Sequence, residues 1–586
     1  MKRTLFEVSL VIMVSGLVFL TNLGTPRLWD RDEPRNAGCA AEMLAANDWV
    51  TPVFNGELRT HKPILLYWFV MASYTVFGVT EFAARFPNAL LGIGTALATY
   101  WMGRRLFSRS VGVWAAIALS TTIMFSVASR AVTPDAPLIF FSTLALAIYV
   151  HGTTADKGES KSTAFARLFP SWPVASLMYA VMGIGILAKG PIGLVLPTAV
   201  IGMYLLIARL PERPRPNTWG QRVVSILSPF APLHFLKTCW FMRPVTAIVC
   251  SLVIALPWYV LVHIQTNGEW TRGFFLTHNL SRATAAMEGH VGGPWFYPVA
   301  ILVGFFPWTI FWLPVAMDSV KQLRSRAAHA DGYLFAISWV GVYVGLFTLA
   351  QTKLPSYITP CYPALALLVG LFMDRLVAQQ LEFSKFWYRA AFGSLAAIGL
   401  GVTIGLPVAA HYLLGGHEVV GVLGLIMLCG GIAGLYFSEQ NQLRLAGGIT
   451  AVTATGFVVC LMSFVAVHVD HERPLAELVA SVYGDEDHAM VDVASLGQVE
   501  PTCVFYCRQV IEPFDDAAAA ASFLQTSSKK RPVIIAQVHR LPEIMEALPE
   551  GTVEVTQVPV LLNDNLAVIR PRARAEVAHG EPSQIR

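Results

Sequence analysis

Long apolar stretches recur along the chain from Leu5 to Val467, with short polar segments between them. A helix that crosses a membrane needs about 17–25 mostly apolar residues. The pattern therefore predicts a polytopic α-helical membrane protein with about thirteen transmembrane helices. The predicted spans are 5–22, 88–103, 111–127, 137–151, 173–188, 191–208, 244–263, 296–316, 333–350, 356–373, 390–411, 418–436 and 445–467.

One further apolar stretch, Ile64 to Phe77, is short and ends at Gly78. Cytoplasmic loops carry the excess of Lys and Arg, so loop charge decides how this stretch is placed. If it crossed the membrane, the basic segment 103–110 would lie on the opposite side from the basic N-terminus. We therefore interpret residues 64–77 as a juxtamembrane or re-entrant helix. This places the N-terminus in the cytoplasm and the loops 23–87 and 264–295 outside it.

The pattern changes after Val467, where short segments with alternating or β-branched residues follow one another. Those that resemble strands are DHAMVDVAS, CVFYCR, RPVIIAQV, VEVTQVPVLL and LAVIRPR, while DDAAAAASFLQ and PEIMEAL resemble helices. We predict a transmembrane domain over 1–467, a small extracytoplasmic α/β domain over 468–574 and a disordered tail over 575–586.

Composition supports a membrane protein. The chain is 55% hydrophobic and 14% charged, whereas soluble proteins average about 25% charged residues. The apolar segment behind Lys2 and Arg3 resembles a signal peptide but lacks a small-residue cleavage site, so we expect an uncleaved first helix. The net charge of +4 is too small to suggest a nucleic-acid partner. The spacing of Cys503 and Cys507 fits neither a redox CxxC motif nor a zinc site, and leaves a disulfide open.

The first predicted extracytoplasmic loop opens with the charged segment WDRDEPR. Asp32 stands before Glu33, Pro34 and an alanine-rich run, as the N-cap of a helix would. A carboxylate at a membrane surface can also act as a general base toward an acceptor hydroxyl, or bind a substrate amine. The sequence alone leaves capping and chemistry open.

Isolated cations lie at predicted helix ends on the same face. They are Lys62 in THKP, Lys189 in AKGP and Lys353 in TKLP, and Asp135 stands on this face in a TPD loop. Each has a structural explanation: the lysines can extend to the interface and Asp135 can cap the next helix. Together, several cations on the extracytoplasmic side run against the positive-inside bias and indicate a phosphate-bearing ligand.

The loop 264–295 adds His278 and Arg282 ahead of an aromatic cluster, and His61 precedes Lys62. Aromatic residues are expected at a membrane interface, whereas His and Arg are less so. A metal or phosphate site is one interpretation, and an interfacial polar residue is the other.

Taken in order, the motifs D-x-D-E-x-R, N-G-x…K-P-x-L-x-Y-W, EFAARFPNAL, TPD, AKGP and TKLPSYITPCYPALALL resemble those of the bacterial lipid A aminoarabinose transferases. These belong to the protein O-mannosyltransferase-like superfamily with the GT-C glycosyltransferase fold. The similarity covers about residues 5–375. Each motif is weak by itself, but six in the same order are specific.

The resemblance implies an inverting glycosyltransferase in the bacterial inner membrane. Its donor would be a polyprenyl-phosphate-linked sugar, and its acceptor lipid A, another envelope lipid or a protein. The catalytic aspartate of the family corresponds to Asp32, with Glu33 and Arg35 beside it. The loop aspartate corresponds to Asp135 and the lysine of the K-P motif to Lys62.

By role, Asp32 would orient or deprotonate the acceptor, which suits a hydroxyl acceptor better than an already ionised phosphate. Lys62, with Arg282, Lys353 and Lys189, would neutralise the departing polyprenyl phosphate. In aminoarabinose transferases a Glu that helps to hold a metal precedes the K-P lysine, and this chain has His61 there. A divalent metal would then be held by His61 and His278.

Two other functions remain open at this point. One is a protein O-glycosyltransferase with the same fold. The other is a transporter or flippase of lipid-linked sugars. Transporters place ionisable groups at the membrane midplane and often contain internal repeats. Here the ionisable residues lie at helix ends on one face, which favours the enzyme.

Overall fold

The computed structural model describes most of the chain. The described residues are 2–29, 32–154, 167–211, 218–280, 292–325, 329–381, 383–414, 418–470, 475–484, 486–526, 530–558 and 565–572. The chain forms two compact units. The first contains residues 1–29, 39–54 and 58–468, and the second contains 30–38, 55–57 and 469–586.

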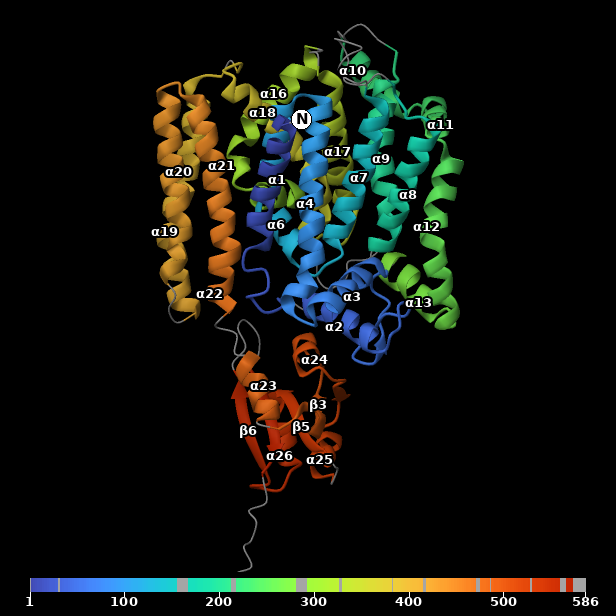
Figure 1. Ribbon diagram of the computed structural model, residues 1–586, viewed down its shortest axis with the longest axis vertical. Helices are drawn as coiled ribbons and strands as arrows, with labels where there is room; N and C mark the ends of the chain where they lie inside the picture. Colours follow the sequence, from blue (N-terminus) through green and yellow to red (C-terminus); the bar gives the residue numbers. More distant parts are fainter. Residues whose placement is uncertain are drawn as a thin grey trace, which may run out of the picture. The chain divides into compact units, whose positions relative to one another are not determined.

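Helices dominate the chain up to residue 470 (Figure 1). The α-helices are α1 (Lys2–Leu20), α2 (Asp32–Ala45), α3 (Leu65–Phe77), α4 (Glu81–Leu106), α5 (Arg109–Ser120), α6 (Ile123–Arg130), α7 (Asp135–Thr153), α8 (Trp172–Lys189), α9 (Ile192–Ala208), α10 (Trp219–Leu227), α11 (Pro232–Phe241), α12 (Pro244–Gln265), α13 (Glu269–Arg272), α15 (Phe296–Gly304), α16 (Trp312–Arg324), α17 (Ala330–Leu349), α18 (Tyr362–Val377), α19 (Lys385–Leu414), α20 (Val422–Glu439), α21 (Leu443–Cys460) and α22 (Ala466–Asp470). Shorter elements are the strands β1 (Val53–Phe54) and β2 (Glu57–Leu58) and the turns of 3₁₀ or π helix η1 (Ser228–Phe230), η2 (Gly273–Leu280), η3 (Trp308–Phe311), η4 (Pro355–Cys361), η5 (Glu418–Gly421) and η6 (Leu461–Val465).

Among the described residues, 9 helices are long and apolar enough to cross a membrane, or up to 11 if two bent pairs each count as one span. Two further predicted spans coincide with α4, of 26 residues, and α9, of 17 residues. Every range that the apolar pattern predicted as a span therefore falls on a helix or a bent pair. The segment interpreted as non-spanning is α3, an apolar helix of 13 residues.

Two predicted spans are broken, which the apolar pattern did not indicate. The axes of α5 and α6 differ by 70°, and those of the pair 296–304 and 308–324 by 116°. The first break lies at Thr121 and Thr122, both buried, whose hydroxyls donate to carbonyls of the preceding helix. Trp308 at the second break donates from Nε1 to Thr121 Oγ1 at 2.8 Å, so the two breaks are joined.

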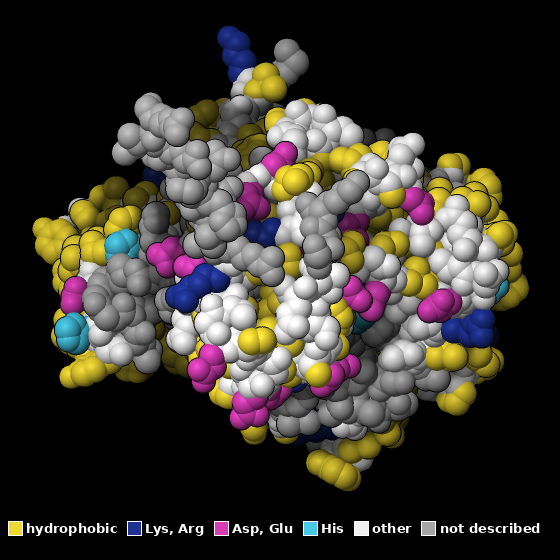
Figure 2. Space-filling model, turned by 90° about the horizontal axis from the view of Figure 1, so that it is seen from below, with side chains coloured by type: hydrophobic (Ala, Val, Ile, Leu, Met, Phe, Trp, Pro, Cys, Tyr) yellow, Lys and Arg dark blue, Asp and Glu magenta, His cyan; other side chains and the backbone are white. Residues whose placement is uncertain are grey.

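The outer flanks of the bundle are apolar. Hydrophobic side chains gather at the left edge of Figure 2, on the side where α19 and α20 lie in Figure 1. They also gather at the right edge, on the side where α12 lies. Along α12 the exposed large apolar side chains include Val245, Val253 and Ile264. Aromatic side chains fill the interior instead, where Tyr149 and Phe335 stack with ring centroids 5.9 Å apart. Apolar side chains on the outside of a helical bundle are what lipid contact requires.

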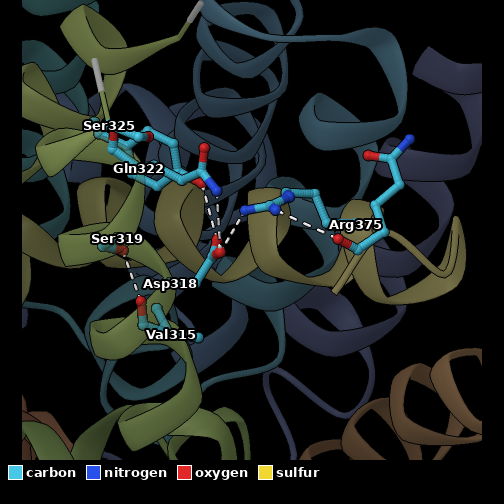
Figure 3. Close-up of polar contacts among 8 residues, drawn as sticks. Val315, Asp318, Ser319, Gln322, Ser325 and Arg375 are labelled. Atoms are coloured by element: carbon cyan, nitrogen blue, oxygen red, sulfur yellow. Dashed lines mark hydrogen bonds and ion pairs between the residues drawn. The ribbon is translucent and has the colours of Figure 1, made fainter. Parts of the chain in front are cut away.

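A buried ion pair joins α16 to α18 (Figure 3). Arg375 points its guanidinium at the carboxylate of Asp318, and Gln322 lies beside both. Tyr333, on α17, donates from Oη to Asp318 Oδ2 at 3.0 Å. Buried charges are retained only when they are paired and hydrogen-bonded, so this cluster ties three helices together at one point.

Helices α8 and α9 form a tight hairpin through Lys189, Gly190 and Pro191. At the hairpin Gly193 lies against the backbone of Gly185 so closely that an added Cβ would overlap its carbonyl group. Small residues at such contacts let two membrane helices approach each other. The close approach fixes where Lys189, at the end of α8, is held.

This contact gives a first prediction. A Gly193→Ala variant is expected to force the two helices apart and to destabilise the protein by about 1–3 kcal/mol, the usual cost of overpacking. Gly341, on α17, has no heavy atom within 4 Å of an added Cβ, and Gly341→Ala serves as the matched control. The control should be neutral or slightly stabilising, because Ala is the better helix former. Thermal unfolding of both proteins in detergent tests this, and equal midpoints would contradict it.

The second unit is built around a five-stranded sheet of order β4-β3-β5-β7-β6. Strand β3 runs parallel to β4 and β5, while β7 runs antiparallel to β5 and β6. The strands are β3 (Val491–Leu496), β4 (Glu512–Phe514), β5 (Arg531–Gln537), β6 (Val553–Val558) and β7 (Leu566–Pro571), and the helices are α23 (Leu475–Tyr483), α24 (Pro501–Cys507), α25 (Ala517–Gln525) and α26 (Leu541–Glu546), with η7 (His488–Met490) and η8 (Val538–Arg540). Buried apolar residues of β3, β5 and β7 pack against α25 and α26 to form its core.

The segment CVFYCR, predicted as a strand, is instead the helix α24. Pro501 stands in its first turn, where proline is favoured, and Cys503, Val504 and Cys507 bury one face at helical spacing. The third parallel strand is β4, which the sequence pattern missed. Both cysteines are free, and burial raises the pKa of the Cys507 thiol to about 12. The predicted tail 575–586 lies outside the described residues.

A short piece of the first loop belongs to the second unit. Asn55 donates from Nδ2 to the Ile511 carbonyl at 2.9 Å, and its Oδ1 accepts from the Ile511 amide at 2.8 Å. Gly56 beside it has φ +75°, a conformation that glycine adopts without strain. The side-chain amide of Asn55 thus pairs with one backbone position in both directions, as a neighbouring strand would.

Candidate active site

A cavity of about 210 Å³ opens where several helices of the first unit end. Its lining comes from the segment before α3, the start of α7, the hairpin of α8 and α9, η2 and the segment between α17 and α18. The lining residues are His61, Lys62, Pro63, Leu138, Lys189, Ile192, Phe274, Phe347, Ala350, Thr352, Ser356, Tyr357 and Pro360. Two of the lysines singled out in the sequence therefore line one cavity.

Lys62 enters the cavity from the segment that leads into α3. The segment is held by Arg59, a buried residue whose Nε donates to Tyr67 Oη at 3.0 Å. Trp270 donates from Nε1 to the Arg59 carbonyl at 2.9 Å. Lys62 itself is half-buried and His61 is exposed. Arg59 was not among the predicted site residues, since only its burial in the fold distinguishes it from a surface arginine.

Lys189 reaches the cavity from the end of α8, and there it meets Asp135 at the start of α7. The ammonium and the carboxylate form an ion pair, with their side chains 14% and 15% exposed. The predicted capping by the TPD loop is not seen, because Pro134 occupies the N-cap position and no side chain caps there. Lys189 Nζ also lies 5.3 Å from the ring centroid of Tyr357, within the range of a cation–π contact.

Lys353 is buried, with 6% of its surface exposed. Its Nζ donates to the carbonyls of Thr348 at 2.8 Å and Ala350 at 2.7 Å, at the C-terminal end of α17. A cation at this position also interacts favourably with the helix dipole. Ala350 and Thr352 line the cavity, so Lys353 supports its wall by holding this turn of the chain.

Asp32, Glu33 and Arg35 lie in the first two turns of α2, in the piece of the first loop that belongs to the second unit. The helix begins at Asp32, in agreement with the predicted helix start within one residue. Asp32 is exposed and Arg35 half-buried, whereas Glu33 is 4% exposed. Asp32 is therefore accessible to a substrate, while the burial of Glu33 favours a role in positioning the helix.

The remaining predicted residues cannot be placed at the cavity. Arg282 and the side chain of His278 lie outside the described residues. Within the described part of the chain, no three His, Cys, Asp or Glu side chains are grouped so that they could hold a metal ion. His61 shares the cavity with two lysines, and this lining suits an anion better than a divalent cation. The metal site that the resemblance implies also needs His278, so it stays a prediction.

Tyr357 and Phe274 were missed by the sequence analysis, although both line the cavity. Phe274 belongs to an aromatic cluster in which its ring stacks on Trp270 at 4.8 Å. Tyr357 belongs to the TKLPSY motif, so the sequence analysis had marked its position. It did not predict the contact of Tyr357 with Lys189. An aromatic residue at a membrane interface is too common for the sequence to single it out.

The comparisons with known proteins agree with this picture. A family model described as dolichyl-phosphate-mannose-protein mannosyltransferase matches residues 61–235, less than half of the chain. An uncharacterized protein of Aquifex aeolicus is 25% identical over 86% of this chain and 87% of its own length. An undecaprenyl phosphate-alpha-4-amino-4-deoxy-L-arabinose arabinosyl transferase of Edwardsiella ictaluri is 29% identical over 69% of this chain and 66% of its own, just under two thirds.

The crystal structure of ArnT from Cupriavidus metallidurans, bound to undecaprenyl phosphate, has a similar fold. Its TM-score is 0.72 at 22% identity, and the match covers 97% of this chain and 98% of that one. The chain therefore has the GT-C fold of that membrane protein, and residues 61–235 match a glycosyltransferase family model. In sequence and in fold the chain is similar to the lipid A aminoarabinose transferases, in agreement with the resemblance found in the ordered motifs.

Proposed function

We propose that this glycosyltransferase moves a sugar from a polyprenyl-phosphate donor to a lipid acceptor of the cell envelope, lipid A or a similar lipid. The observation that carries the proposal is the cavity in which Lys62 and Lys189 come together. A point charge such as a lysine ammonium suits a phosphate, and apolar walls suit a prenyl chain. The similarity to arabinosyl transferases that use an undecaprenyl-phosphate donor supports the same assignment.

In the proposed reaction an acceptor oxygen attacks the anomeric carbon while the bond from that carbon to the phosphate oxygen breaks. The anomeric configuration inverts, and polyprenyl phosphate leaves with an additional negative charge. Lys62 and Lys189 stabilise this charge as it develops, which is the largest contribution that such a site can make. Asp135 holds the Lys189 ammonium in place before the donor binds.

Asp32 is proposed to take the proton of an acceptor hydroxyl or to orient the acceptor, with Arg35 as a further contact for the donor phosphate. Arg282 stays a candidate for the same phosphate. Lys353 is proposed to hold the turn of the chain that forms the cavity wall, because its ammonium already donates to two carbonyls there. A carboxylate can contribute as a general base only when the attacking group carries a proton, so this role assumes a hydroxyl acceptor.

We further propose that the chain lies in the bacterial inner membrane with the N-terminus in the cytoplasm and the second unit outside. The chain is a multi-pass membrane protein by its apolar helices. The orientation follows from the basic loops, which fall on the side of the N-terminus. Polyprenyl-phosphate donor and lipid acceptor would then meet on the outer leaflet.

A transfer assay tests the proposal and separates it from its alternatives. Purified protein in vesicles is incubated with a polyprenyl-phosphate donor that carries a labelled sugar and with a membrane extract. Label in a lipid product supports the proposed function, and label in protein supports protein O-glycosylation. Movement of the labelled donor between leaflets without transfer would support a flippase and would overturn the proposal.

Lys62→Gln is expected to lower kcat/KM for the donor by about 10- to 100-fold, since a hydrogen bond to a charged group contributes about 1.5–3 kcal/mol. Lys62→Arg keeps the charge and should recover part of the loss. Lys385→Gln removes an exposed lysine on α19 that pairs with Glu439, and serves as the control. Initial rates against donor concentration measure the effect. An unchanged kcat/KM in Lys62→Gln would exclude Lys62 from phosphate binding.

A further inference from the structure

Helices α10 and α11, joined by η1, expose an unusual amount of apolar surface. Figure 1 shows them beside α9 at the end of the bundle where the N-terminus lies. No residue of α10 is buried, and Trp219 is 79% and Trp240 74% exposed. Helices with apolar side chains outward beside a bundle that crosses the membrane are expected to lie in the headgroup region of the bilayer.

An open groove of about 580 Å³ runs between the end of α9 and α11. Arg209 and Lys237 provide its charge, and Leu236, Trp240 and Phe241 provide its apolar walls. No acidic side chain lines the groove within the described part of the chain. The combination of two cations with an apolar wall in one groove is the feature that calls for an explanation.

The arginine of the groove is held in a fixed position. The Arg209 guanidinium carbon lies 4.2 Å from the centroid of the Phe241 ring, and Nη1 donates to Thr238 Oγ1 at 3.1 Å and to the Lys237 carbonyl at 3.3 Å. Among the described residues no acceptor bonds to its Nε or Nη2, or to Nζ of Lys237. An arginine that stacks on an aromatic ring and keeps two donor nitrogens available is well suited to bind a phosphate.

We propose that this groove binds the headgroup of an anionic phospholipid. The phosphate lies between Arg209 and Lys237, and the first part of an acyl chain follows Leu236 and Trp240. The charge of the groove complements the headgroup, and the exposed apolar side chains of α10 and α11 place the groove at the depth where headgroups lie. The groove lies beyond the end of α9, away from the candidate active site at its start.

Binding of phosphatidylglycerol to the full-length protein in a neutral detergent tests the proposal, with native mass spectrometry to count bound lipids. A cation near an anionic lipid surface contributes about fivefold in affinity. Lys237→Gln is expected to weaken binding about fivefold, and Arg209→Gln with Lys237→Gln about 25-fold. Phosphatidylcholine has no net charge, so the original protein should bind it weakly. Its affinity for phosphatidylcholine should be no higher than the affinity of the double variant for phosphatidylglycerol.

Arg444→Gln is the matched control, because Arg444 is an exposed arginine at the same end of the bundle, in the first turn of α21, outside the groove. It should bind phosphatidylglycerol like the original protein. Lys237 is exposed, and its ammonium has no hydrogen-bond or ion-pair partner among the described residues, so Lys237→Gln alone tests the site even if the double variant folds poorly. Equal binding by Lys237→Gln and Arg444→Gln would overturn the proposal. Full displacement of the lipid by millimolar inorganic phosphate would do so too, since a free anion would then be the ligand.

Discussion

An Asp32→Asn variant is expected to transfer sugar about 10²–10⁴ times more slowly than the original protein, the usual contribution of a general base. Asn keeps the shape of the side chain but cannot take a proton at neutral pH. The side chain is exposed at the start of α2, so the change leaves no cavity and no buried group without a partner. Loss of a negative charge in the first helical turn costs only about 0.3–1 kcal/mol. The variant should therefore fold and fail in catalysis.

The measurement is the initial rate of label transfer at saturating donor, together with thermal unfolding of the same preparation. Glu57→Gln is the matched control, because Glu57 is an exposed carboxylate in the same loop but outside α2. The control should keep its rate. A fast Asp32→Asn variant would mean that the attacking group of the acceptor is already ionised, or that another residue is the base. A variant that is slow and also unfolded at lower temperature would indicate a structural role.

The helices could be predicted from the sequence to a large extent because lipid imposes a length and a polarity on every span. What the pattern could not reveal was the break within a span, as at Thr121 and Thr122. Apolar residues continue on both sides of this break, and the bonds made there by the two threonine hydroxyls and by Trp308 are visible only in the fold. The segment 503–508 was predicted as a strand but is helical for a similar reason. A short apolar run fits a helix as well as a strand.

The site was predicted less completely. The sequence marked Lys62 and Lys189 as unusual cations on one face, and both line the cavity. It could not show that Lys189 is paired with Asp135, 54 positions away. Nor could it show that Lys353 donates to carbonyls of the helix before it. Partners that meet only through packing of distant helices leave no periodic signal in one sequence.

The second large effect concerns stability, and it lies away from the active site. Arg375→Met is expected to destabilise the protein by about 3 kcal/mol, because it leaves the charge of Asp318 buried without its ion pair. The side chain of Asp318 is 4% exposed and that of Arg375 21%. Tyr333 still donates to the carboxylate, which keeps the loss near the lower end of the range for broken buried pairs.

An exposed pair of an arginine and a carboxylate provides the control. Arg389 binds Glu439 through two nitrogens, with side chains 61% and 39% exposed. Arg389→Met should change stability very little, because solvent screens such pairs and takes over their hydrogen bonds. Titration of both detergent-solubilised variants with SDS, followed by circular dichroism, compares the two losses. Equal losses would contradict the argument that burial decides the effect.

A double variant separates the charge from the packing. In Asp318→Leu with Arg375→Met both charges are gone, and apolar side chains fill much of the same space in contact with Tyr333. Replacement of a whole buried pair by apolar residues is often neutral or stabilising, so the double variant should regain most of the loss. Helices α16, α17 and α18 meet at this cluster, and Figure 3 shows Asp318 and Arg375 within it. A double variant that stayed as unstable as Arg375→Met would show that specific hydrogen bonds, rather than an uncompensated charge, hold the three helices together.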